Sequence, residues 1–139
     1  MNAPRIRRVL ETALYVTDMA RAVAFYRDVL GLFAMGGNER LTPIDAGEGT
    51  VLLLFRQGAS ADGIDYPGGR IPAHDGTGPV HMAFAIDDDA FDAWKARLAD
   101  HGVAIEVVNH WDRGGRSAYL RDPDGHSIEL ATPGLWPTY

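Results

Sequence analysis

Two segments of this chain, residues 11–18 and 81–88, repeat one pattern. Each begins with a side chain that can bind a metal, Glu11 or His81, and continues as the alternating residues typical of a half-buried strand. An acidic helix-cap candidate, an amphipathic run and a glycine follow in both copies. A duplicated half-domain that presents one metal-capable residue from each copy predicts a functional site between the copies.

The order βαβββ is predicted for the first copy. Its opening strand covers residues 9–16, and Asp18 is expected to cap a helix that ends at Gly31. Three short strand candidates follow, at 32–35, 40–45 and 50–56.

The second copy has the same predicted order. Its opening strand covers 79–86, and Asp87 or Asp88 is expected to cap a helix that ends at Gly102. Its strand candidates lie at 104–108, 116–121 and 126–131.

These patterns predict an α+β fold built from two βαβββ modules. The expected organisation is a single domain over residues 1–139. Module one covers about 9–57, a linker 58–78, module two about 79–132, and a tail 133–139. The linker is rich in Gly, Pro, Asp and Ser, so it is expected to be either a plain tether or a loop that covers the site.

The composition excludes several classes of site and partner. The chain has no cysteine, which removes disulfides, thiolate nucleophiles and Cys-ligated metals. Its 13 Lys and Arg against 19 Asp and Glu give a net charge of −6, so nucleic acid is not an expected partner. There is no apolar run of membrane-spanning length and no signal-peptide pattern, and we expect a cytoplasmic protein that does not bind membranes.

A turn near the end of the chain predicts strand register. Residues 122–125 read Asp-Pro-Asp-Gly, a strong signal for a type I turn between antiparallel strands. If Gly125 adopts the left-handed conformation as a bulge, Asp122 pairs with His126. Tyr119 then lies opposite Glu129.

Three candidate metal ligands, Glu11, His81 and Glu129, lie on strand faces that carry small or polar side chains. A single His or Glu on a strand is more often solvated or hydrogen-bonded, but two copies that place a ligand at one register favour a site. An imidazole and two carboxylates suit a divalent metal such as Fe, Mn, Ni or Zn.

The chain resembles the vicinal-oxygen-chelate superfamily, which includes glyoxalase I, extradiol dioxygenases, fosfomycin-resistance proteins and bleomycin-binding proteins. The resemblance lies in four segments: 15–18, 24–32, 81–84 and 119–130. It implies a glyoxalase/dioxygenase-like fold, in which the paired βαβββ modules form a cupped mixed sheet around a metal site. The substrate would chelate the divalent metal there through two neighbouring oxygens. The modules of this superfamily pair within one chain or across a dimer, and a homodimer is expected here.

The resemblance assigns metal ligands to Glu11, His81 and Glu129. His or Gln is common at the first of these positions, so Glu11 makes the site more anionic and weakens the analogy with dioxygenases. Residues 50–55 lack the additional Glu of glyoxalase I. Three protein ligands with exchangeable positions are therefore expected.

Further candidates surround these ligands. The spacing of His110, Tyr119 and Glu129 resembles that of extradiol dioxygenases, which makes Tyr119 and His110 candidate catalytic groups. The candidates for substrate binding are Tyr15, Arg56, His74 and Arg116. The two arginines are included because arginine binds carboxylate or phosphate in a fork. His126 points away from Glu129 by strand parity and is expected to be structural.

The resulting hypothesis is a metal-dependent enzyme of the dioxygenase or the lyase and isomerase type, acting on a small oxygenated substrate. The alternative is a non-catalytic drug-binding protein that uses an apolar cleft with Trp111, Tyr15 and Phe55. In the tail, Trp136 and Tyr139 suggest docking on the other subunit or on the same domain.

Overall fold

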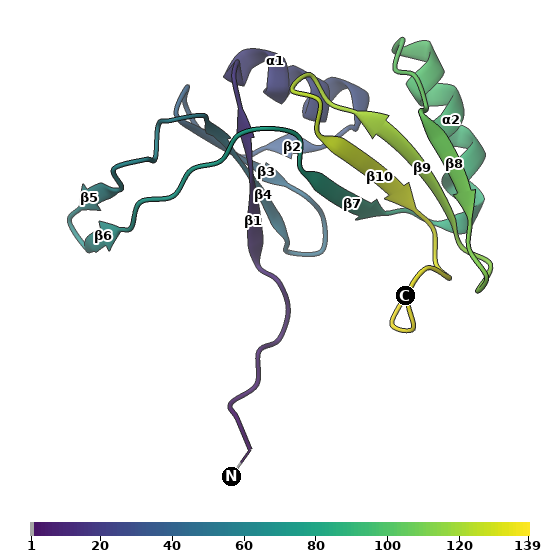
Figure 1. Ribbon diagram of the computed structural model, residues 1–139, viewed down its shortest axis with the longest axis horizontal. Helices are drawn as coiled ribbons and strands as arrows, with labels where there is room; N and C mark the ends of the chain where they lie inside the picture. Colours follow the sequence, from purple (N-terminus) through teal and green to yellow (C-terminus); the bar gives the residue numbers. More distant parts are fainter. Residues whose placement is uncertain (1) are drawn as a thin grey trace.

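The computed structural model describes residues 2–139, so Met1 of the expected domain lies outside it. The described residues form two βαβββ modules, as the repeat predicts (Figure 1). In each module the first and last strands are parallel neighbours, and the remaining pairs are antiparallel. The α+β fold class is confirmed.

In module one, Asp18 caps the first helix as predicted. Its carboxylate accepts a hydrogen bond from the backbone N–H of Arg21 at 3.1 Å. The helix continues as a π-helical turn, and Gly31 follows it with φ = 71°. The elements are β1 (Glu11–Val16), α1 (Met19–Ala24), η1 (Phe25–Val29), β2 (Phe33–Ala34), β3 (Leu41–Asp45) and β4 (Val51–Arg56). The strand order is β1-β4-β3-β2.

Module two repeats this order as β7-β10-β9-β8. Its elements are β7 (His81–Ala85), η2 (Asp88–Ala90), α2 (Phe91–Asp100), β8 (Val107–His110), β9 (Arg116–Arg121) and β10 (Ser127–Ala131). Asp87 is the N-cap residue of η2, which leads directly into α2, but its side chain makes no capping hydrogen bond. Ala90 is the N-cap of α2, and the Asp88 carboxylate instead binds Arg116 at 2.8 Å.

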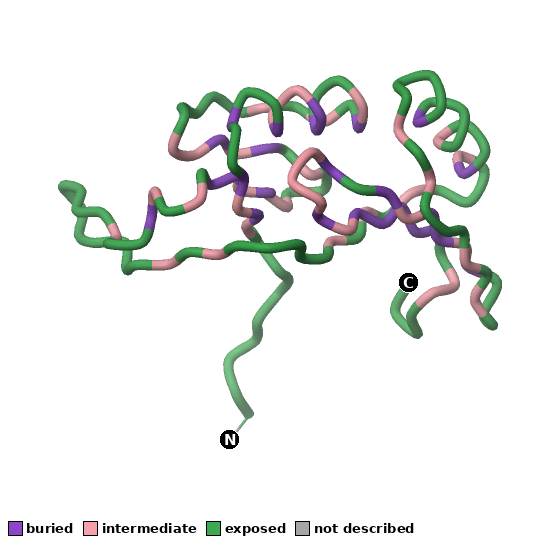
Figure 2. The backbone as a smooth tube through the Cα atoms, turned by 45° about the horizontal axis from the view of Figure 1, so that its top comes forward, coloured by how far each residue is buried: buried purple, intermediate pink, exposed green. Residues whose placement is uncertain are grey.

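The core is shared between the modules. Both helices lie on the same side of the strands (Figure 1), and buried residues follow the strands beneath them (Figure 2). One hydrophobic cluster includes Leu14, Leu52, Leu120 and Ile128, all at most 1% exposed. The opposite faces of the two sheets, which carry Glu11, His81 and Glu129 by strand parity, are the faces away from the helices.

The turn at 122–125 fastens module two to module one. The phenol of Tyr26 donates to the buried carboxylate of Asp122 at 2.7 Å, and the hydroxyl of Thr17 donates to Asp124 at 2.7 Å. Gly125 has φ = 82°, as the predicted turn requires.

His126 joins the modules from the same turn. Its Nδ1 accepts a hydrogen bond from the N–H of Val80 at 3.1 Å, so the ring proton lies on Nε2, which donates to the carbonyl of Tyr15 at 2.9 Å. Only 1% of His126 is exposed. The structural role predicted for it agrees with these contacts.

The connector between the modules contains structure that its composition did not predict. Residues 58–78 include a hairpin of β5 (Ile64–Tyr66) and β6 (Gly69–Ile71), which projects from the body of the molecule at the left of Figure 1.

The tail lies on its own domain. The hydroxyl of Tyr139 is 3.0 Å from the carbonyls of both Ile86 and Ala131, whereas Trp136 is 64% exposed. Among the helices of residues 2–139, none has the length and apolar character needed to cross a membrane.

Candidate metal centre

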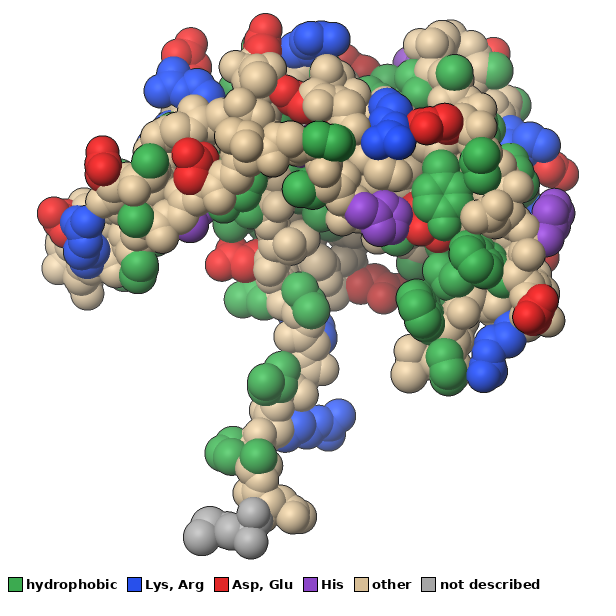
Figure 3. Space-filling view, viewed as in Figure 1, with side chains coloured by type: hydrophobic (Ala, Val, Ile, Leu, Met, Phe, Trp, Pro, Cys, Tyr) green, Lys and Arg blue, Asp and Glu red, His purple; other side chains and the backbone are tan. Residues whose placement is uncertain are grey.

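His81 and Glu129 meet on the open face of module two. They come from the parallel strands β7 and β10, and Nε2 of His81 lies 3.2 Å from Oε1 of Glu129. Glu129 is only 3% exposed, whereas about half of the His81 side chain is accessible. Figure 3 shows histidine, acidic and hydrophobic side chains gathered over β7, β9 and β10.

The tautomer of His81 makes this pair suited to a cation. Nδ1 lies 2.9 Å from the carbonyl of Ser127, which can only accept, so Nδ1 carries a proton. In a neutral ring Nε2 then has a free lone pair directed at a carboxylate oxygen of Glu129. Two acceptors at this distance repel each other unless a proton or a metal ion lies between them. This donor set therefore fits a divalent metal.

Tyr119 and Ser117 line the same face as Glu129. Tyr119 lies directly opposite Glu129 in β9, which confirms the predicted register. Its ring stacks on that of His81 with the centroids 6.2 Å apart. Burial and the nearby Glu129 carboxylate raise the pKa of Tyr119, so the phenol keeps its proton and can donate it to an oxygen.

Glu11 does not join this pair within one chain. It is exposed at the start of β1, in the sheet of module one. Across residues 2–139, no three His, Asp or Glu side chains come close enough together to hold a metal ion. A single chain therefore brings together two of the three predicted ligands.

Two other predicted site residues are directed away from the His81–Glu129 pair. His110 pairs with Arg116, one register position from the Asn109–Ser117 pair, so both point to the face opposite Glu129. The guanidinium of Arg116 stacks on Phe91 at 4.4 Å and binds Asp88. His110 and Arg116 are thus directed toward the side of α2, away from the metal-capable pair.

A second cluster occupies the open face of module one. The phenol of Tyr15 is 2.7 Å from Nδ1 of His74, and both rings pack against Phe55. The connector that carries His74 thus lies on the face of β1 and β4. Arg56, also predicted to bind substrate, is exposed at the end of β4 and alternates to the side opposite Phe55. Arg40 instead places its guanidinium 5.7 Å from the Phe55 ring.

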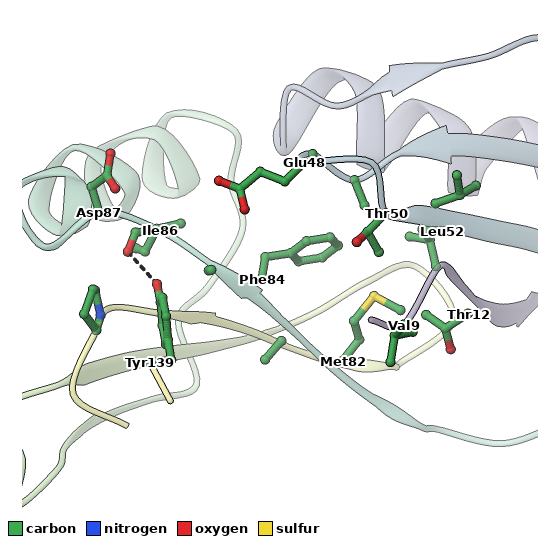
Figure 4. Close-up of a pocket in the computed structure, with 16 residues that line it drawn as sticks. Val9, Thr12, Glu48, Thr50, Leu52, Met82, Phe84, Ile86, Asp87 and Tyr139 are labelled. Atoms are coloured by element: carbon green, nitrogen blue, oxygen red, sulfur yellow. Dashed lines mark hydrogen bonds between the residues drawn. The ribbon is translucent and has the colours of Figure 1, made fainter. Parts of the chain in front are cut away.

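A cavity of about 560 Å³ opens between the modules. In Figure 4, Met82 and Phe84 of β7 face it from one side, and Thr12, Thr50 and Leu52 from the other. His81 and Glu129 do not line it, but Ala83, the register partner of Glu129, does. The cavity lining mixes apolar side chains with Thr12, Glu48, Thr50 and Asp87, and the His81–Glu129 pair lies outside it.

Sequence reasoning missed Ser117. The Ser117 hydroxyl donates to Oε2 of Glu129 at 2.5 Å and is fully buried. A signal was present, because Ser117 lies two residues before Tyr119 and so shares its strand face.

Comparison with known proteins gives one family. The protein-family model described as the Glyoxalase/Bleomycin resistance protein/Dioxygenase superfamily matches residues 8–130. Catechol-2,3-dioxygenase of Bacillus subtilis is 31% identical over 119 residues, which cover 84% of this chain and 38% of that protein. The chain thus spans less than half of this relative.

Other relatives match over more of their length. Metallothiol transferase FosB of Staphylococcus saprophyticus is 27% identical over 94% of this chain and 80% of its own. A crystal structure titled lactoylglutathione lyase, from Agrobacterium tumefaciens, has a TM-score of 0.86 and 36% identity, and covers 96% of this chain and 99% of its own.

Proposed function

This chain belongs to the glyoxalase/bleomycin resistance protein/dioxygenase superfamily, and from this premise we propose that it is a metal-dependent enzyme. His81 and Glu129 are two ligands of a divalent metal, and Glu11 of a second copy is the third. When bound, the metal supplies Lewis-acid polarisation to a small substrate with neighbouring oxygens. The observation that carries the proposal is the 3.2 Å approach of Nε2 of His81 to Oε1 of Glu129, with Nδ1 held by the carbonyl of Ser127.

The second copy follows from the repeat. Glu11 begins β1 as His81 begins β7, and both strands lie at the edge of their sheet with the open face away from the helices. A two-fold arrangement that sets module one of one copy against module two of the other brings Glu11 to His81 and Glu129. It creates two equivalent sites, each with ligands from both chains, so a homodimer is part of the proposal.

In this arrangement the substrate lies between the two open faces. Tyr119 donates a proton or hydrogen bond to a substrate oxygen from the module-two side. Tyr15 and His74 bind the substrate from the module-one side, where both rings pack against the buried Phe55. Burial and the carboxylate of Asp75 raise the pKa of Tyr15, so this phenol also remains a donor.

The reaction class that we propose is isomerisation or elimination of the lyase type, without ring cleavage. The extradiol resemblance depended on His110, and β8 directs that side chain away from Glu129. The similarity over whole chain length to a structure titled lactoylglutathione lyase supports the same choice.

Metal analysis of purified protein tests the proposal. The wild type should bind Mn²⁺, Ni²⁺, Zn²⁺ or Fe²⁺ stoichiometrically and run as a dimer in size-exclusion chromatography with light scattering. Glu129→Ala, His81→Ala and Glu11→Ala should each lose the metal, and the matched control Glu39→Ala, at an exposed position, should keep it. Substoichiometric metal in the wild type, equal to that in Glu129→Ala, would end the proposal.

A mixing experiment tests the second copy directly. Glu11→Ala and Glu129→Ala chains are refolded together in equal amounts. If the ligands come from different chains, each mixed dimer has one intact site and the mixture recovers about a quarter of the wild-type metal content. If all three ligands come from one chain, the mixture recovers none.

The alternative function has a distinct result. Calorimetric binding of an aromatic cationic drug to the metal-free protein, with Glu11→Ala unchanged, would favour a drug-binding protein. Turnover of an α-hydroxythioester or hemithioacetal by the metal-loaded wild type, lost in Glu129→Ala, would favour the lyase class.

A further inference from the structure

A chain of two hydrogen bonds runs across the sheet of module two to Glu129. The indole N–H of Trp111, directly after β8, donates to Oγ of Ser117 in β9 at 2.8 Å. Ser117 then donates to Oε2 of Glu129 in β10 at 2.5 Å. The two bonds thus link the segment after β8, through Ser117 of β9, to the Glu129 carboxylate of β10.

The direction of this chain is fixed by the chemistry of its members. An indole can only donate and a carboxylate can only accept. The single proton of the Ser117 hydroxyl, which already accepts from Trp111, must therefore point to Glu129. Oε2 is occupied by this bond, and Oε1, 3.2 Å from His81, is the oxygen that faces outward.

Burial makes the arrangement firm. Ser117 is fully buried and Glu129 is 3% exposed, so water competes poorly for either bond. A short hydrogen bond to a charged acceptor is among the stronger ones in proteins. The carboxylate is consequently held in one orientation before any ligand arrives.

The loop of Trp111 is itself fixed. The N–H of Trp111 donates to the carbonyl of Gly115 at 2.8 Å, and Gly114 donates back to the carbonyl of Trp111 at 2.9 Å. A Cβ on Gly115 would lie 2.6 Å from the backbone carbon of Gly134, so the loop packs directly on the tail. The indole therefore sits on a rigid support.

We propose that Trp111 and Ser117 are positioning residues that make Glu129 bind its metal through one oxygen, Oε1. This inference rests on the proposed metal function. It adds a specific consequence: the second carboxylate oxygen stays out of the coordination sphere, which leaves a position open for substrate.

The test uses the full-length protein loaded with Co²⁺, whose visible absorption spectrum reports coordination number. Dissociation constants come from calorimetry. The variants are Ser117→Ala, Ser117→Thr and Trp111→Phe, and the control is Ser60→Ala, another buried serine that accepts one side-chain hydrogen bond, from Arg40 at 3.0 Å.

Ser117→Ala should weaken Co²⁺ binding by about tenfold or more and change the spectrum toward higher coordination number, since Oε2 becomes free. Trp111→Phe should change the Co²⁺ affinity and the spectrum in the same direction, but by less. Ser117→Thr, which keeps the hydroxyl, should have an affinity and a spectrum close to those of the wild type. Ser60→Ala should match the wild type in both.

Wild-type affinity and spectrum in both Ser117→Ala and Trp111→Phe would overturn the inference and leave the metal function intact. A wild type that binds no Co²⁺ would instead overturn the proposed function and the inference with it. If Ser117→Ala does not fold, Trp111→Phe decides, because that substitution keeps an aromatic ring in place of the indole.

Discussion

The phenol of Tyr15 and Nδ1 of His74 lie 2.7 Å apart, although the residues are 59 positions apart in the chain. The contact draws the connector across the open face of module one. Two further bonds hold the same segment: the N–H of His74 donates to the carbonyl of Ser60 at 3.0 Å, and the N–H of Gly58 donates to Asp75 at 3.0 Å.

His74→Ala should release this part of the connector without unfolding the molecule. Limited proteolysis should cut the variant faster within residues 58–80, while its thermal midpoint stays close to that of the wild type, because the side chain is outside the buried core. Thr77→Ala, at an exposed position of the same segment, is the control. Equal cleavage rates in His74→Ala and wild type would contradict the role of the contact.

Asp75 should make the connector sensitive to acid. Hydrogen bonds from the backbone of Gly58 and then of Gly76 hold the pKa of Asp75 below its ordinary value. A folded pKa that is lowered contributes stability above the unfolded value, and this contribution is lost as the pH falls through the folded pKa. The protection factor of the Gly58 amide, its exchange rate relative to an unstructured peptide at the same pH, should fall in that range. Asp75→Asn should show low protection at neutral pH as well.

Tyr119→Phe should lower kcat by about a hundredfold and leave metal affinity unchanged. The phenol lies beside the metal-capable pair, and its raised pKa keeps it protonated at neutral pH. Steady-state kinetics and calorimetry on one preparation separate the two effects. Tyr66→Phe, in the projecting hairpin, serves as the control, and unchanged kcat in Tyr119→Phe would remove this residue from the reaction.

Arg116→Ala should reduce stability and not catalysis. The guanidinium stacks on Phe91 and binds Asp88, so its loss should cost about 1 kcal/mol of unfolding free energy, measured with urea. The kcat and KM of Arg116→Ala and of His110→Ala should match the wild type, because both side chains point to the face opposite Glu129. A large rise in KM would show that either residue reaches the substrate.

Tyr26→Phe should destabilise the chain by about 1–3 kcal/mol, because it leaves the buried carboxylate of Asp122 without this donor. Burial, followed by the charge of Asp122, raises the pKa of Tyr26 well above its ordinary value. In an alkaline titration followed by tyrosinate absorbance, Tyr26→Phe should therefore show the same native-state amplitude as the wild type. A lower amplitude in the variant would mean that Tyr26 ionises in the folded protein.

The repeat and the turn at 122–125 predicted the parts of the fold that local chemistry decides. Each opening strand is followed by its helix in both modules. Tyr119 pairs with Glu129, as expected when Gly125 takes a positive φ. Such features depend on residues that are close together in the sequence, so the sequence alone predicts them.

Features that depend on packing were not predictable in the same way. Residues 103–105 alternate like a strand, but Val103 and Ile105 are half-buried against the core in a loop, and β8 starts only at Val107. His110, which lies beyond the predicted strand at 104–108, is therefore the last residue of β8 and points to the face opposite Glu129. The hairpin β5–β6 escaped prediction because all six of its residues are exposed and no hydrophobic alternation marks them.

The candidate site was predictable as a set of residue types and not as an assembly. Strand parity identified the shared face of His81 and Glu129, and the structure brings them together. Parity cannot say whether Glu11 reaches them in the same chain, because that depends on how the two sheets are placed in space.

The contacts of Asp122, Asp124 and His126 with module one make the two halves of the chain depend on each other. The turn between β9 and β10 packs on module one. If the two halves were severed, the buried side chains of Tyr26, Asp122 and His126 would lose their hydrogen-bond partners. A cut within the connector should therefore yield two fragments that fold only when both are present.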